Sequence, residues 1–281
     1  IVGDINNLQE KLEGKIPVDI LELIHLVNSW GRSNKIIIFQ SNKQIEIDNC
    51  EAKECHDLSR LDVSQVDNMN DLFMYSNFYN FHSLNGNIIN NSDISNWDVS
   101  GVTSMDSMFY RAEKFNSDIG NWNVSKVTSM TRLFNGAKIF NQDISKWDVS
   151  NVNSFSNMFN GTQNFNQNLN SWNVSNVTNM SNMFYFAKSF NQPLNNWNVS
   201  NVENMNYMFC GAKMFNQDIN SWDVSNVKII NGFFQDTINF NQPLNNWDIS
   251  NVVSISYIFK NAKTFNQNIS NWNLDKLEFF E

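Results

Sequence analysis

Tryptophan recurs at a strict interval of 25 residues along most of this 281-residue chain. A fixed period of about 20–50 residues is typical of solenoids, propellers and linear arrays, in which each repeat packs mainly against its neighbours. The period constrains the fold more than any other feature, and it favours binding over an extended surface rather than chemistry in a pocket. Eight residues make up this tryptophan column: Trp97, Trp122, Trp147, Trp172, Trp197, Trp222, Trp247 and Trp272.

Each repeat contains two hydrophobic spacings. In Ile119–Val124 the tryptophan and the valine are two residues apart, which is the period of a strand. In Val127–Ala137 the apolar residues are three or four apart, which is the period of a helix, and Ser125 or Thr128 is a candidate N-cap. We therefore expect an α/β fold, a leucine-rich-repeat-like solenoid of 25-residue strand–turn–helix coils with a parallel sheet.

The tryptophan column is predicted to lie in the core. Each buried indole removes about 150–250 Å² from water, and in Ile119–Val124 the strand period places Trp122 and Val124 on the same side. Exposure of the tryptophans would therefore expose the whole apolar face of the strand. Carbohydrate-binding aromatic residues are the functional alternative for this column.

In each repeat from Trp97 to Trp247, a phenylalanine stands eighteen residues after the tryptophan and an asparagine stands nineteen residues after it. An unpaired backbone group in a buried turn costs about 1–3 kcal/mol, and an asparagine side chain offers both a donor and an acceptor. We predict that these residues bridge adjacent coils as a structural ladder. The ladder comprises Asn116, Asn141, Asn166, Asn191, Asn216, Asn241 and Asn266.

Polar residues stand one and three positions after each tryptophan, where a leucine-rich-repeat strand would face the concave surface. They form the candidate concave binding face, although a solvated polar face is an equally good interpretation. Recurring Asp and Asn oxygens also suggest calcium binding as an alternative. A regular Ser/Asn face suggests a further alternative, the ordering of water as on an ice-binding surface. The residues of the candidate face are Asp98, Asp148, Asp223, Asp248, Ser100, Ser150 and Ser225.

The formal net charge of −9 argues against binding to nucleic acid or anionic membranes, which needs basic patches. No stretch approaches 18 apolar residues, so no transmembrane segment is predicted. No catalytic, cofactor-binding or metal-binding phrase is present, so we expect no enzyme and no cofactor. The three histidines, His25, His56 and His82, lie outside the regular repeats.

Residues 1–57 lack the repeat and are predicted to cap the repeat region, residues 58–281. The cap is expected to contain a helix at Pro17–Trp30 and a hairpin formed by Lys35–Phe39 and Gln44–Ile47.

The first copy of the repeat has Leu61 in the tryptophan position, and it is followed by an insertion at about residues 81–91, which predicts a surface loop. Cys50 and Cys55 are close enough in sequence for a disulfide, but their geometry decides this, and three free thiols, including Cys210, are the simpler interpretation.

The phrase Trp147–Val152, followed by the M-F-x-x-A-x-x-F-N-Q-D-I pattern, resembles the BspA-type leucine-rich repeats. In particular it resembles the 25-residue repeat of unknown function in mycoplasma surface lipoproteins, over roughly residues 92–277. The resemblance implies a non-enzymatic interaction module, a cell-surface or secreted adhesin or host-interaction protein with a protein or host-matrix partner and a membrane anchor upstream of residue 1. The alternative is an intracellular adaptor or substrate receptor, because Ile16–Ile24 resembles the opening of an F-box.

Overall fold

In the computed structural model, residues 63–64, 66–74 and 94–279 are described in full, together with the backbone of six short strands. Residues 18–30, which carry most of the predicted helix, lie outside the described residues, as do Cys50 and Cys55. The strands are β1 (Ile16–Pro17), β2 (Lys35–Gln40), β3 (Lys43–Asp48), β4 (Leu61–Asp62), β5 (Phe81–His82) and β6 (Ile88–Ile89).

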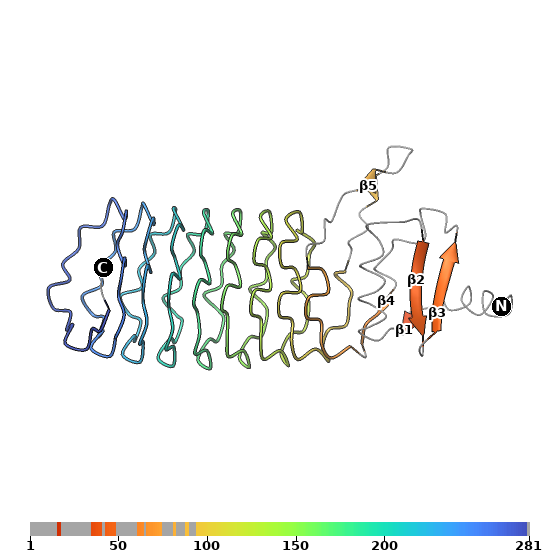
Figure 1. The fold of residues 1–281 in the computed structure, drawn as a ribbon, viewed down its shortest axis with the longest axis horizontal. Helices are drawn as coiled ribbons and strands as arrows, with labels where there is room; N and C mark the ends of the chain where they lie inside the picture. Colours follow the sequence, from red (N-terminus) through yellow and green to blue (C-terminus); the bar gives the residue numbers. More distant parts are fainter. Residues whose placement is uncertain are drawn as a thin grey trace.

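The six strands form three separate pairs. Figure 1 labels β1 to β5, which lie in the N-terminal part of the chain. Strands β2 and β3 pair antiparallel, which confirms the hairpin predicted from Lys35–Phe39 and Gln44–Ile47. Strand β1 pairs in parallel with β4, which places Ile16 beside Leu61 of the first repeat copy. Strands β5 and β6 pair antiparallel within the predicted insertion. Pro17, the expected start of a helix, is therefore a strand residue.

Residues 94–279 wind into a stack of similar coils, one for each 25-residue repeat (Figure 1). We call this region the coil stack. Each coil joins the next through a single-residue parallel bridge seven residues after its tryptophan. The bridged residues form one column along the stack: Asn68, Ser104, Ser129, Ser154, Asn179, Asn204, Ile229, Ser254 and Phe279.

The prediction of an α/β solenoid with strand–turn–helix coils is wrong. The residues that the structure describes contain no helix, and the segment around each tryptophan is not a strand. In the second regular coil the Trp122 N–H donates to the Ile119 carbonyl at 3.1 Å, and the Val127 N–H donates to the Val124 carbonyl at 2.9 Å. These bonds close tight turns, so the alternation of apolar residues here arises from turns rather than from a pleated sheet.

The segment expected to be helical is also a series of turns. Between Met130 and Ala137, alternate N–H groups donate to the carbonyl three residues back, as Leu133 does to Met130 at 3.2 Å. The intervening N–H groups donate to the next coil, as Phe134 does to Met158 at 3.0 Å. Arg132 has a φ of 58°, which an α-helix excludes. Successive turns thus reproduce a three- to four-residue apolar spacing without a helix.

Aromatic rings fill the interior of the coil stack. The tryptophans from Trp97 to Trp247 are only 2–4% exposed. From Trp122 to Trp272, each indole Nε1–H donates to the carbonyl of an Ile or Leu 28 residues earlier, at 2.9–3.2 Å. Phenylalanines stack between coils, as Phe184 does on Phe209 with centroids 5.4 Å apart. Each coil therefore contributes both ring contacts and a buried hydrogen bond to its neighbour.

Two columns of asparagine side chains tie the turns of adjacent coils together. In the ladder from Asn116 to Asn266, each Oδ1 accepts the backbone N–H of the next asparagine at 2.8–2.9 Å. A second column, four residues after the tryptophan, donates Nδ2 to a serine carbonyl of the preceding coil at 2.7 Å. The second column was not predicted, although its Ser-Asn-Val phrase is visible in the sequence. It comprises Asn151, Asn176, Asn201, Asn226 and Asn251.

Candidate functional site

The candidate concave binding face is built into local turns. The Asp148 carboxylate is exposed, but its Oδ1 accepts the backbone N–H of Ser150 at 3.1 Å. Asp98, Asp223 and Asp248 make the same bond to the serine two residues on, at 3.0–3.1 Å. Such Asx turns are a structural use of Asp and Asn. Asn173, at the same repeat position, makes the bond with its amide oxygen.

Hydrogen bonds within two of these turns also favour the ionised form of the carboxylate. The side-chain hydroxyl of Ser150 and then its backbone N–H lower the pKa of Asp148. The backbone N–H of Ser250, followed by its hydroxyl, lowers the pKa of Asp248. Because the same bond forms with either Asp or Asn, this column has a structural role as a turn-forming element of every coil.

A different face of the coil stack carries residues that change from coil to coil. We call it the variable face, and it consists of the positions ten and thirteen residues after each tryptophan. The first position holds Ser107, Arg132, Asn157, Asn182, Tyr207, Gly232 and Tyr257. The second holds Tyr110, Asn135, Asn160, Tyr185, Cys210, Gln235 and Lys260.

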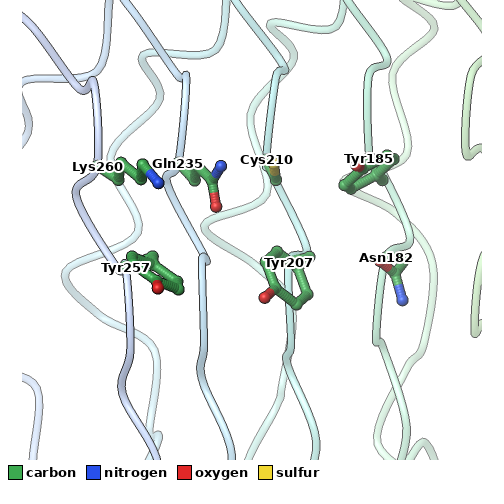
Figure 2. Close-up of a pocket in the computed structure, with 7 residues that line it drawn as sticks. All are labelled: Asn182, Tyr185, Tyr207, Cys210, Gln235, Tyr257 and Lys260. Atoms are coloured by element: carbon green, nitrogen blue, oxygen red, sulfur yellow. The ribbon is translucent and has the colours of Figure 1, made fainter. Parts of the chain in front are cut away.

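The variable face is hollowed near its C-terminal end by a groove of about 440 Å³. Figure 2 shows the lining side chains in two parallel rows, which correspond to the two repeat positions of the variable face. We call this hollow the tyrosine groove. It is lined by Asn182, Tyr185, Tyr207, Cys210, Gln235, Tyr257 and Lys260.

Glycine in one coil makes room for a ring from the preceding coil. A Cβ at Gly232 would lie 2.2 Å from Cε1 of Tyr207, and Gly232 has a φ of +55°. A Cβ at Gly211 would lie 2.9 Å from the ring of Phe186. A side chain at either glycine would therefore collide with an aromatic ring. Gly232 stands between Tyr207 and Tyr257 at the same repeat position, and the Tyr207 ring lies over it.

Contacts within the groove orient its polar groups. The Lys260 Nζ lies 4.5 Å from the centroid of the Tyr257 ring, a cation–π distance. The rings of Tyr185 and Tyr207 meet edge to face with centroids 6.4 Å apart. Burial raises the pKa of Tyr185, and Cys210, Tyr207 and Asp236 add to the effect. The phenol of Tyr185 therefore stays protonated and can donate a hydrogen bond.

Burial also raises the pKa of Cys210 from its usual value of 9.0 to about 12, with a further contribution from Asp236. The side chain is 2% exposed. A thiol is nucleophilic only as the thiolate, so at neutral pH Cys210 is a small apolar floor of the groove rather than a nucleophile.

We expect the folded protein to react with a thiol reagent at pH 10 at least about 50-fold more slowly at Cys210 than the urea-unfolded chain does. Below pH 9 the stability from the protonated thiol is fully present, and it is lost as the pH rises towards 12. Labelling would be followed in a Cys50→Ser/Cys55→Ser variant, so that only Cys210 reports. Equal labelling rates in folded and unfolded protein would contradict the burial of this thiol.

A second hollow of similar size lies at another corner of the coil stack and is lined by polar residues. Its side chains are engaged in local structure, since Asp143 accepts the Ser145 N–H at 2.9 Å and Asn170 accepts the Asn196 N–H at 2.9 Å. In the part of the chain that the structure describes, no cluster of three or more His, Cys, Asp or Glu side chains is suited to a metal ion.

The tyrosine groove therefore offers ring faces together with hydroxyl, amide and ammonium donors, which suit binding. The groove was not predicted from the sequence, because the predicted sites comprised only the constant columns of the repeat. The signal that could have found it is the occurrence of Tyr185, Tyr207 and Tyr257 at two variable positions of the repeat.

Among the described residues, no helix is long and apolar enough to cross a membrane.

Comparison with known proteins identifies a family. No curated protein and no solved structure matches the chain. The family model described as "Mycoplasma protein of unknown function, DUF285" matches three times in tandem, at residues 43–141, 76–197 and 186–281. These overlapping matches cover most of the chain and follow its tandem repeats. The chain therefore belongs to this family of repeat-containing mycoplasma proteins of unknown function.

Proposed function

We propose that this chain is a non-enzymatic protein-interaction module that binds its partner through the tyrosine groove. The observation that supports the proposal is the gathering of Tyr185, Tyr207, Tyr257 and Lys260 around one hollow of the coil stack. Residues that dominate protein interfaces are enriched in tyrosine and are clustered rather than evenly spread. A column that repeats the same Asp, Asn or Ser in every coil offers no such anchor.

The construction of the coil stack favours this use of the groove. Both tyrosines are held on coils bonded to the next coil, since the Tyr207 N–H donates to the Asn231 carbonyl at 2.7 Å and, in the coil of Tyr257, the Ile255 N–H donates to the Phe279 carbonyl at 3.3 Å. Tyrosine supplies contact area with few rotatable bonds, so little side-chain entropy is lost on binding. A groove on such a scaffold is pre-organised, which reduces the cost of association.

The cellular setting that we propose is the cell surface or the extracellular medium, with a host or matrix protein as the partner. This part of the proposal is supported by the resemblance of the repeat phrase to BspA-type repeats, many of which are found on cell surfaces. The net charge of −9 favours a protein partner over nucleic acid.

We expect the double variant Tyr207→Ala/Tyr257→Ala to bind immobilised matrix proteins and intact host cells at least about tenfold more weakly than the parent chain. The reason is that truncation of two anchors in one groove removes about 1.4 kcal/mol or more of binding free energy. Equilibrium binding of the purified chain to each surface would measure the effect, with thermal unfolding as a check on folding.

Two further variants make the result specific to the groove. Tyr110→Ala removes a tyrosine at a variable-face position outside the groove and should leave binding unchanged. Asp148→Arg/Asp223→Arg reverses charge on the candidate concave face and should also have little effect. Loss of binding in the charge-reversed variant alone would move the site to that face, and absence of binding to every surface would refute the proposed partner class.

A further inference from the structure

We infer that the ligand of the tyrosine groove is a proline-rich segment of the partner in the polyproline II conformation. The inference rests on the proposed function, and it adds the conformation and the chemistry of the bound segment. It is carried by two observations, the spacing of the tyrosines along the coil stack and the set of donors that surrounds them.

The spacing of the groove matches the period of a polyproline II helix. Tyr207 and Tyr257 occupy the same repeat position two coils apart, and adjacent coils are joined by parallel bridges. Two coil spacings of parallel-bridged backbone amount to about 9.6 Å. One turn of a polyproline II helix has three residues and advances about 9.3 Å. Residues three apart in such a segment would therefore reach equivalent places beside the two tyrosines.

The coil between the two tyrosines has no side chain at this repeat position. It carries Gly232, where a side chain would collide with the Tyr207 ring. The row therefore alternates between a large ring, a glycine and a second large ring. The Tyr207 ring lies over Gly232, so the row presents two aromatic rings with no third side chain between them. Aromatic-lined grooves are a recurring way of recognising proline-rich segments, which lose little entropy because their conformation is preformed.

The polar groups of the groove complement the backbone of such a segment. A polyproline II helix has no internal hydrogen bonds, so its carbonyl groups are available as acceptors. The groove presents donors in two rows: the tyrosine hydroxyls, the amides of Asn182 and Gln235, and the ammonium of Lys260 (Figure 2). Burial raises the pKa of Tyr185, so its phenol keeps the proton that it would donate.

The length of the groove sets the length of the segment. The lining residues run over four coils, from that of Asn182 to that of Tyr257, which is three coil spacings or about 14 Å. At about 3.1 Å per residue, five or so residues of polyproline II span this distance. A short proline-rich stretch of the partner is therefore sufficient.

The test measures fluorescence anisotropy of labelled peptides with the purified full chain. The principal probe is a peptide of about twelve residues built from Pro-Pro-Ala repeats, which places equivalent prolines three residues apart. The register control has Pro-Pro-Ala-Ala repeats and places them four apart. A Gly-Ser peptide of equal length is the flexible control, and a labelled β-1,4-linked N-acetylglucosamine oligomer represents carbohydrate.

We expect the Pro-Pro-Ala peptide to bind at least about fivefold more tightly than the Pro-Pro-Ala-Ala peptide. The Gly-Ser peptide should not bind. Tyr207→Ala and Tyr257→Ala should each weaken binding by about tenfold, whereas Tyr110→Ala should not. Equal affinity for both periods would overturn the inference, and so would unchanged binding in the tyrosine variants or a preference for the carbohydrate.

The outcomes separate this inference from the proposed function. If Tyr207→Ala/Tyr257→Ala abolishes binding to matrix proteins or cells but no proline-rich probe binds, the groove is an interaction site for another class of segment, and only the polyproline II inference fails. If neither the surfaces nor the peptides bind, both fail.

Discussion

Replacement of Trp197 by alanine is expected to lower the free energy of unfolding by about 3–5 kcal/mol, the usual cost of removing a large buried aromatic side chain. Trp197 is 3% exposed, and its ring stacks on that of Trp222 with centroids 6.3 Å apart. Its indole N–H also donates to the Leu169 carbonyl of the preceding coil at 2.9 Å. The change therefore removes contacts with both neighbouring coils at once. Urea unfolding followed by circular dichroism would measure it.

Two controls separate the contributions of the ring and of its position. Trp197→Phe keeps an aromatic ring and should be less damaging, because the Leu169 carbonyl retains its bond from the Trp172 N–H at 3.0 Å. Trp272→Ala should cost less than Trp197→Ala, since Trp272 is only partly buried in the described structure. In a linear array the stability depends on nearest-neighbour interfaces. An equal loss of unfolding free energy in Trp197→Ala and Trp272→Ala would contradict this dependence on neighbouring coils.

Replacement of Asn166 by alanine is expected to destabilise the chain by about 1–3 kcal/mol, the cost of an unpaired backbone donor away from water. The Asn166 Oδ1 accepts the Asn191 N–H at 2.9 Å in a part-buried corner. Alanine keeps the backbone N–H of residue 166, which donates to Asn141 at 2.9 Å, so one rung is lost and the next remains. Denaturant unfolding at unchanged m-value would measure the loss.

The matched control for this prediction is Asn173→Ala. The Asn173 Oδ1 accepts the Ser175 N–H at 3.1 Å, but this turn is exposed, so water can replace the side chain. The expected change is within about 0.5 kcal/mol. Equal destabilisation by Asn166→Ala and Asn173→Ala would show that the ladder contributes nothing beyond an ordinary surface turn.

The conformation of the coils could not be predicted from apolar spacing alone. Residues such as Met130, Leu133, Phe134 and Ala137 have the three- to four-residue spacing of a helix, and successive turns bury the same residues. The two alternatives differ in where the backbone N–H of residues such as Phe134 finds its acceptor. In the coil stack that acceptor is the Met158 carbonyl of the next coil, a partner that only tertiary stacking supplies.

The candidate site was hidden from sequence reasoning for a similar reason. Tyr207 and Tyr257 are fifty residues apart, and Gly232 between them is unremarkable until the coils are stacked in register. Stacking then places the three residues in one row, in which Tyr207 and Tyr257 line the groove. By contrast, Asp148 and Asp223 were prominent in the repeat phrase, and they close local turns of their own coils.

What the sequence by itself determined was the 25-residue period and membership of a tandem-repeat family, because a repeat is a property of the one-dimensional chain. The tertiary structure alone decided that the coils consist of turns and that their variable positions form a groove. The physical reason is that half of the N–H groups in each turn-forming segment are satisfied by the neighbouring coil. Until that neighbour is in place, the local pattern is equally compatible with a helix.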